Sequence, residues 1–202
     1  MRLRTTILLL TLLSCTNKQG GETTKSDIIQ NKINVPKTWK TLDFKEFTIQ
    51  VPPTWVQVRI KGIDSYVGLI ALDNGDTASF DLGWYSNSLE EEYKFKVENG
   101  DVYLKNEKES TLNSTVYEFY GKADTVDVEQ FKVNKIKWTT VDGKRAKIVQ
   151  PRKTGKGMTG IYFDSLWTAG SGTDRFEMNG TDLHPDNEQR LLQAFETLKF
   201  KK

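Results

Sequence analysis

The side chains that could take part in catalysis are few in this 202-residue chain, and their spacing matches no catalytic motif. His184 is the only histidine, which excludes a histidine-rich metal site. The Gly-x-Ser-x-Gly motif of a nucleophilic serine is absent. Because His184 directly precedes Pro185, we interpret it as the entry to a helix. Carboxylates are plentiful, yet nothing in the sequence selects a pair for glycoside hydrolysis. We therefore expect a protein that is not an enzyme and that holds no cofactor and no metal.

Two further motifs have only a formal likeness to ligand sites. Residues 155–160 match G-x-G-x-x-G, but the strand-like residues 161–163 follow where a dinucleotide site needs a helix. We expect a glycine-rich hairpin loop there. Asp73, Asp76 and Asp81 lack the spacing, the glycine and the distal glutamate of an EF-hand. We expect a turn with solvated acids rather than a calcium site.

Basic side chains gather in one stretch that contains no acid. Residues 145 and 147 would share one face of a strand, since side chains alternate along it. Such a patch could bind an anionic membrane surface. The alternative, which we favour, is a solvated hairpin whose lysines discourage strand pairing at a sheet edge. The six residues are Lys144, Arg145, Lys147, Arg152, Lys153 and Lys156.

The beginning of the chain has the pattern of a secretory signal peptide. Arg2 and Arg4 give a positive front, residues 7–13 are apolar except for Thr11, and Ser14 precedes Cys15, the only cysteine. The apolar run is too short to span a bilayer as a helix, which needs about 20 residues. We expect residues 1–14 to be the signal peptide.

A small residue followed by cysteine resembles the lipobox of bacterial lipoprotein precursors. The resemblance implies cleavage before Cys15, lipidation of its sulfur, acylation of the new amino terminus and a membrane anchor in the cell envelope. Leu13 is a less common lipobox residue. Thr16 stands where an aspartate often signals retention in the inner membrane, which favours the outer membrane facing the periplasm. The alternatives are an ordinary signal peptide with a leftover thiol, or an apolar cytosolic start.

The composition bounds the remaining possibilities. The chain has 29 basic and 27 acidic residues, and Arg2 and Arg4 leave with the leader, so the mature protein is balanced. A neutral protein gives no reason to expect nucleic acid as a partner. Aromatic residues make up 11% and include five tryptophans, enough for a real core. A lone cysteine excludes an internal disulfide. We expect a monomer with one domain.

We expect residues 15–37 to be a lipidated cysteine with a flexible polar tether, and residues 38–202 to be a single α+β domain. Alternating residues and turn signals such as Asn74-Gly75 and Asp142-Gly143 predict hairpins. The middle of the chain is harder to interpret, and we expect a short helix over residues 89–97. A helix that begins at His184-Pro185 and a short final strand at residues 198–200 close the chain. Strands are expected at 47–51, 55–60, 67–72, 78–85, 114–120, 135–140, 145–149, 160–167 and 174–178.

The two ends of this domain carry a resemblance. Residues 47–52 with Trp55 soon after, and a closing helix that runs into residues 194–200, resemble the PsbP-like fold. That superfamily includes the extrinsic subunit of photosystem II, the Ran-binding Mog proteins and many bacterial lipoproteins. The resemblance implies an antiparallel sheet with flanking helices in an α/β/α sandwich, and members that bind rather than catalyse.

We therefore expect a lipid-anchored envelope protein that binds a protein partner or a small ligand. Trp84, Tyr85 and Trp167 either line a cleft or pack in the core. An envelope hydrolase with a carboxylate-based site is the alternative, and two converging acids with raised pKa in a pocket would favour it. A structural accessory would instead show a large flat patch and no pocket.

Overall fold

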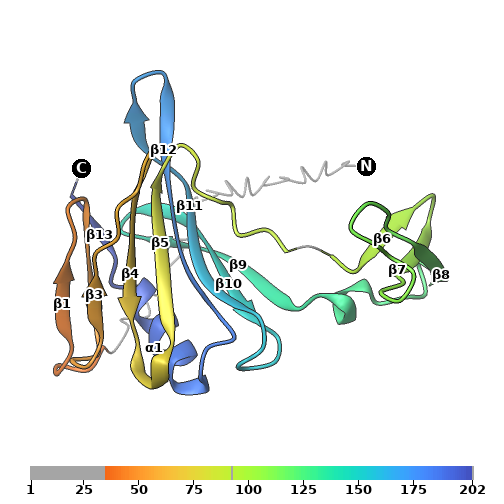
Figure 1. The fold of residues 1–202 in the computed structure, drawn as a ribbon, viewed down its shortest axis with the longest axis horizontal. Coiled ribbons are helices and arrows are strands. Elements are labelled where there is room, and N and C mark those ends of the chain that lie inside the picture. The colour runs from red at the N-terminus through yellow and green to blue at the C-terminus, as the bar shows by residue number, and fades with distance from the viewer. Residues whose placement is uncertain (1–34, 92, 202) are drawn as a thin grey trace, which may run out of the picture. The chain divides into compact units, whose positions relative to one another are not determined.

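The computed structural model describes residues 35–91 and 93–201 (Figure 1). The expected signal peptide, Cys15 and residues 16–34 of the expected tether lie outside the described residues. In the described ranges, strands predominate and pair antiparallel. One α-helix, α1 (Pro185–Phe195), precedes a short final strand, β13 (Lys199–Phe200). The prediction of an antiparallel sheet with a C-terminal helix and a final strand is confirmed. No helix in this part of the chain is long and apolar enough to cross a membrane.

The largest element is a seven-stranded sheet, which we call the main sheet. Its strands lie in the order β3-β4-β5-β12-β11-β10-β9, so β3 and β9 are its edges. The predicted hairpin at Asp142-Gly143 is confirmed, because both residues have positive φ and Val141 pairs with Lys144. The strands are β3 (Val56–Val58), β4 (Tyr66–Ala71), β5 (Thr77–Gly83), β9 (Asn134–Val141), β10 (Lys144–Pro151), β11 (Met158–Ala169) and β12 (Gly172–Thr181).

A second sheet covers one face of the main sheet together with α1. This cover sheet has the order β1-β2-β13, with β1 (Lys40–Asp43) and β2 (Phe47–Val51). Phe47 on β2 is fully buried, and its ring centroid lies 5.0 Å from that of Phe80 and 4.9 Å from that of Phe176. Figure 1 shows α1 behind the main sheet, and Leu191 and Phe195 join the same core. The main core therefore fills the space on one face of the main sheet. We call the other face the open face, although a small cluster of Leu89, Val149 and Tyr162 is buried there.

A third sheet, the insert sheet, is formed by the part of the chain between β5 and β9. It has the order β6-β7-β8, with β6 (Phe95–Glu98), β7 (Asp101–Lys105) and β8 (Tyr117–Lys122). Phe131, in the short 3-10 helix η2 (Val128–Phe131), packs on Phe95 and Tyr120 at centroid distances of 5.9 and 5.1 Å. These rings give the insert sheet a small aromatic core of its own.

The helix expected over residues 89–97 is wrong, since β6 begins at Phe95 and residues 86–91 are not helical. Leu89 has a φ of 54°, which an α-helix does not admit. Its backbone N–H donates to the side chain of Asn87, and its own side chain is buried against Val149 and Tyr162. The carboxylate of Glu91 accepts from the backbone N–H groups of residues 133 and 134. These contacts with distant strands hold residues 86–91 in a non-helical course.

The interpretation of the segment near Asn74 as a turn with solvated acids is corrected by the structure, because Asp76 accepts hydrogen bonds from the protein. The β4–β5 hairpin is confirmed, but pairing stops at Ala71 and Thr77, and the loop between them includes the 3-10 helix η1 (Asp73–Gly75). Asp76 Oδ2 accepts from the backbone N–H of His184 at 2.7 Å and from Asn187 Nδ2 at 2.8 Å. His184 directly precedes α1, as expected. The carboxylate of Asp76 therefore fixes the start of α1 on the main sheet.

The glycine-rich segment belongs to a hairpin loop, as predicted, because β10 ends at Pro151 and β11 begins within the segment at Met158. Its backbone is held by two carboxylates. Glu188 of α1 accepts from the N–H of Gly155 at 2.9 Å, and Asp182 accepts from the N–H of Gly157 at 2.7 Å. Neither geometry resembles a phosphate-binding turn that opens a helix.

Replacing Asp76 by Ala should lower the free energy of unfolding by about 2–3 kcal/mol, because the fully buried Asn187 loses a charged acceptor and the start of α1 loses its partner. Urea denaturation followed by circular dichroism measures this. Asp124→Ala, in an exposed turn, is the control and should change stability by less than about 0.5 kcal/mol. Equal effects of the two substitutions would contradict the anchoring role.

Candidate functional site

An open hollow of about 700 Å³ lies at the end of the main sheet where β5 ends and β4 begins. We call it the aromatic depression, because large side chains stand around it with unusual exposure. Ile63 is 98% exposed, Tyr85 76% and Trp84 43%. Several exposed apolar side chains around one hollow form a candidate interaction surface. The hollow is lined by Gly62, Ile63, Asp64, Ser65, Tyr66, Leu82, Gly83, Trp84, Tyr85 and Asp174.

Two glycines, Gly172 and Gly83, allow the close contacts that shape the depression. A Cβ atom on Gly172 would lie 2.3 Å from Cε2 of Trp84, so the indole rests directly on the backbone where β12 begins. A Cβ atom on Gly83 would lie 2.9 Å from the Cβ of Ser65, so the loop before β4 approaches the end of β5 closely. Trp84 is thus held in place by backbone packing while part of its ring faces solvent. The depression is a formed feature of the fold.

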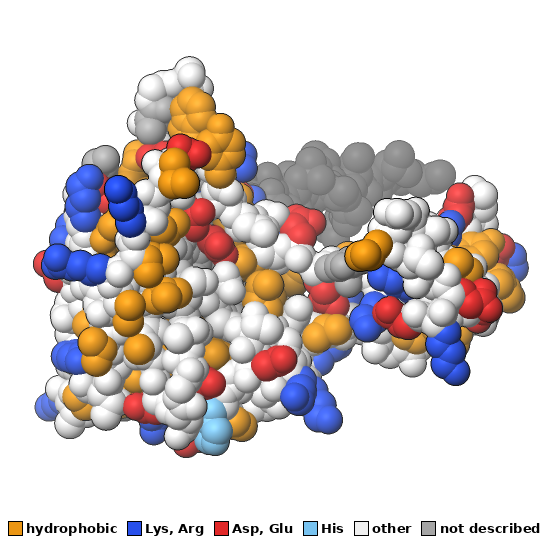
Figure 2. Space-filling view, in the orientation of Figure 1, with side chains coloured by type: hydrophobic (Ala, Val, Ile, Leu, Met, Phe, Trp, Pro, Cys, Tyr) orange, Lys and Arg blue, Asp and Glu red, His pale blue; other side chains and the backbone are white. Residues whose placement is uncertain are grey.

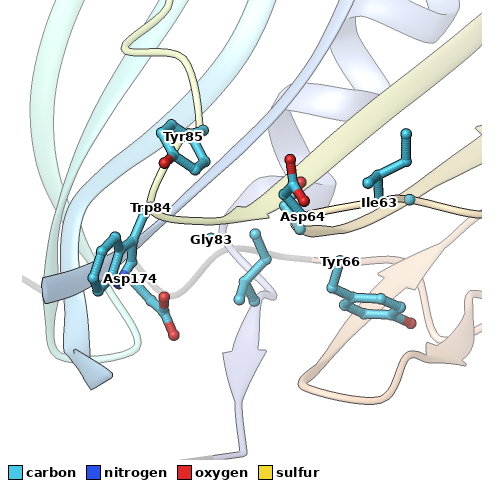
Figure 3. A pocket seen from close by; sticks show the side chains of 10 residues that line it. Ile63, Asp64, Tyr66, Gly83, Trp84, Tyr85 and Asp174 are labelled. Atoms are coloured by element: carbon cyan, nitrogen blue, oxygen red, sulfur yellow. The ribbon is translucent and has the colours of Figure 1, made fainter. Parts of the chain in front are cut away.

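Polar groups complete the depression. In Figure 3, the Asp174 carboxylate lies beside the Trp84 ring, and Asp64 lies on the opposite side with Ile63. Asp174 Oδ2 accepts from Trp167 Nε1 at 2.8 Å. Trp167 is half-buried, its ring centroid lies 6.2 Å from that of Phe200, and it does not line the depression. Two aromatic faces beside two carboxylates can contact a flat apolar group and accept hydrogen bonds from its polar neighbours.

The sequence predicted part of this site. Trp84 and Tyr85 were expected either to line a cleft or to pack in the core, and the structure places both at the depression. Trp167 instead packs against the core. Ile63 and Asp174 were not identified, because neither belongs to a motif and only the fold brings residues 62–66 to β12. The glycines at 62 and 83 were the available signal, since glycine often marks a close backbone approach.

The six basic residues expected as a possible patch lie along β10 and its loop to β11. Arg145 and Lys147 share the open face of the main sheet, as predicted. Arg145 stacks on Trp138, with its Cζ 3.7 Å from the ring centroid, and pairs with Asp164 at 3.2 Å. Arg152 pairs with Glu129 at 2.6 Å. These two cations are neutralised locally, which supports the interpretation of a solvated hairpin over that of a membrane-binding patch.

The remaining basic residues differ in burial. Lys147 is only 6% exposed, and its ammonium lies 5.4 Å from the centroid of the Tyr162 ring. Burial lowers the pKa of Lys147, and the nearby Glu90 opposes that change. Lys153 and Lys156 are exposed at the loop between β10 and β11, and Lys144 is half-buried near Asp142. The six charges therefore do not form one uniform surface.

Two carboxylates lie side by side on the open face, and no sequence motif pairs them. Asp81 on β5 and Glu177 on β12 are direct cross-strand partners. Burial raises the pKa of Glu177; the hydrogen bond from Asn179 Nδ2 lowers it, and the charge of Asp81 raises it further. Ser86 Oγ donates to the backbone carbonyl of Asp81 at 2.7 Å. Figure 2 shows hydrophobic side chains gathered on this face toward β3 and β4, with acidic ones nearer its middle.

Neutralising Glu177 tests this pair. A carboxyl whose pKa is raised by folding favours the folded state when protonated, and this contribution is lost as pH rises through the folded pKa. Glu177→Gln should therefore raise the melting temperature at neutral pH by about 2 °C, and the gain should shrink toward the acid side of the ordinary glutamate pKa. Differential scanning fluorimetry across pH measures this. Glu109→Gln, on an exposed loop, is the control, and a gain independent of pH would contradict the pairing.

Comparisons with models of known protein families, with curated proteins and with solved structures find no match for this chain.

Proposed function

We propose that this protein is a non-enzymatic binding module of the cell envelope, and that its aromatic depression is the contact site for a protein partner. The observation that carries this proposal is the exposure of Trp84 and Tyr85 beside a formed, open hollow. Tryptophan and tyrosine contribute disproportionately to binding energy at protein interfaces. A wide, open hollow suits a protruding side chain or loop of a partner, whereas sites for small molecules enclose most of the ligand.

The proposed place of action is the membrane surface. Cys15 in its lipobox-like setting would carry the lipid anchor, and the polar residues up to 37 would hold the domain away from the headgroups. Several acyl chains on one cysteine exceed the two-chain requirement for stable anchoring. An outer membrane location facing the periplasm follows from Thr16 in the same resemblance.

For the fold we propose the PsbP-like class. Its support is the order of parts: β2 is soon followed by the fully buried Trp55 near the start of the domain, and α1 is followed by β13 at its end. The described part of the chain contains one α-helix, on one face of the main sheet. On the other face, residues 84–91 lie where a sandwich would place its second helical layer. Residues 84–91 are not helical, so a helical layer of an α/β/α sandwich has support on one side only.

Hydrolysis by a carboxylate pair is the second candidate, and Asp81 with Glu177 is the observation that favours it. A carboxyl with a raised pKa is suited to act as a general acid. Against it, neither carboxylate lines the aromatic depression. Binding without chemistry is therefore the better-supported function.

Removing the aromatic wall should abolish partner binding. In crosslinking from intact cells, we expect the yield of the crosslinked complex to fall at least about tenfold for Trp84→Ala with Tyr85→Ala. Gly172→Ala should give a similar loss, because the added methyl displaces Trp84 without removing it. Phe119→Ala, an exposed aromatic of the insert sheet, is the matched control and should leave the yield unchanged. Loss in all variants, or in none, would argue against the depression as the contact site.

The anchor has a separate test. Cys15→Ala should move the protein from the membrane to the soluble fraction, because no acyl chain can be attached. Ser14→Ala keeps a small residue before the cysteine and should leave the protein in the membrane. Fractionation of cells followed by immunoblotting measures both. A Cys15→Ala protein that stays in the membrane fraction would overturn the anchoring proposal.

A further inference from the structure

The edge strand β9 presents backbone groups that no described residue pairs. It is the last strand of the main sheet, with β10 as its only neighbour there. The Asp142-Gly143 turn makes Val141 and Lys144 a hydrogen-bonded pair, and such pairs recur at every second residue of an antiparallel ladder. The bond from the N–H of Arg152 to the carbonyl of Val133 belongs to the same series. Pro151, which has no N–H to give, stands opposite Asn134.

This register decides which groups face outward. The odd-numbered residues of β9 bond to β10, so the N–H and C=O groups of Asn134, Ile136, Trp138 and Thr140 point away from the sheet. The backbone N–H of Asn134 donates to Glu91 Oε2 at 3.0 Å. Ile136, Trp138 and Thr140 remain, and they form an open row of alternating donors and acceptors along the edge.

Apolar and basic side chains of β9 lie on opposite faces of the main sheet. Ile136 and Trp138 lie on the open face of the main sheet and are 45% and 44% exposed. Arg145 stacks on the Trp138 ring from the neighbouring strand. Lys135 and Lys137 lie on the opposite face and are exposed. Lys137 also acts on the half-buried carboxyl of Glu196, whose pKa burial raises and Lys137 lowers.

We propose that β9 binds an extended segment of a partner protein by strand addition, and that this segment alternates acidic and apolar side chains. Backbone groups of the added strand would pair with Ile136, Trp138 and Thr140. Its acidic side chains would face Lys135 and Lys137, and its apolar ones would cover Ile136 and Trp138. A second copy of this chain fits less well, because symmetric pairing of two β9 strands sets the lysines of both copies on one face. The surface lies at the opposite edge of the main sheet from the β3–β4 side, so it is separate from the aromatic depression.

The probe is a short synthetic peptide in which glutamate alternates with valine, added to the full chain purified in detergent. Hydrogen exchange should show new protection of the amides of Ile136, Trp138 and Thr140. Fluorescence anisotropy of the labelled peptide gives the affinity. A peptide of the same composition with its glutamates grouped together should bind at least about tenfold more weakly, because it cannot place all its acids on one face.

Two variants separate backbone pairing from charge. Ile136→Pro removes an outward N–H and leaves the β10 ladder intact, as prolines at sheet edges do, so affinity should fall about tenfold while the melting temperature stays close to that of the parent. Lys135→Glu with Lys137→Glu keeps every backbone group. It should reverse the preference, so that a lysine–valine peptide binds better than the glutamate–valine peptide. Lys153→Glu with Lys156→Glu changes the same net charge elsewhere and should not reverse it.

Several results would overturn the proposal. The first is protection that falls outside β9, and the second is equal affinity for the acidic and basic peptides. A third is a concentration-dependent dimer that Ile136→Pro dissociates, which would assign the edge to a second copy. Protection of the three amides before any peptide is added would assign it to a segment of the chain itself. Trp84→Ala should leave peptide binding unchanged, so failure of the aromatic depression as a site would be seen separately.

Discussion

The contact of Phe47 with Phe80 and Phe176 joins the cover sheet to the main sheet, and the fold depends on it. The one cysteine lies at position 15, so the domain has no internal disulfide, and burial must supply its stability. A buried aromatic ring removes roughly 150–250 Å² from water, which corresponds to about 4–6 kcal/mol of transfer free energy as an upper estimate. Because β2 and α1 share one face of the main sheet, the largest cluster of buried residues lies on that face. The main core does not extend to the open face.

The connection from β5 to β9 crosses the open face of the main sheet. These strands are far apart in the main sheet, so residues 84–91 must cross the open face over β12, β11 and β10. Ser86 donates to the backbone carbonyl of Arg175 on β12, Leu89 packs on Tyr162 and Val149, and Glu91 reaches Asn134 on β9. The crossing explains why Lys147 and Glu177, both on an otherwise open face, are desolvated. It also leaves Trp84 at the start of the crossing, beside β12, where the aromatic depression forms.

Features that depend on neighbours in sequence could be predicted, and those that depend on distant contacts could not. Alternation and an Asp-Gly turn are local, so β9 and β10 were predicted with their hairpin. The helix at Pro185 is likewise encoded by a proline and by apolar spacing. The non-helical course of residues 86–91 depends instead on contacts of Leu89 and Glu91 with strands that follow much later. The partners of Asp76 also lie more than a hundred residues away in sequence. Its local sequence therefore indicates only a turn that contains acids.

The two edges of the main sheet are protected against pairing in different ways. β3 has three residues and offers too short a template for an added strand. β9 has eight residues, and its protection is incomplete: Glu91 caps its first outward amide, and lysines on one face oppose pairing with another copy. An edge that only had to resist pairing would carry polar side chains on both faces. Ile136 and Trp138 instead give one face of β9 an exposed apolar surface, and an arginine stacked on the tryptophan holds its ring in place. Lysines that repel a second copy would attract an acidic strand, so the same residues that prevent self-association would select the partner.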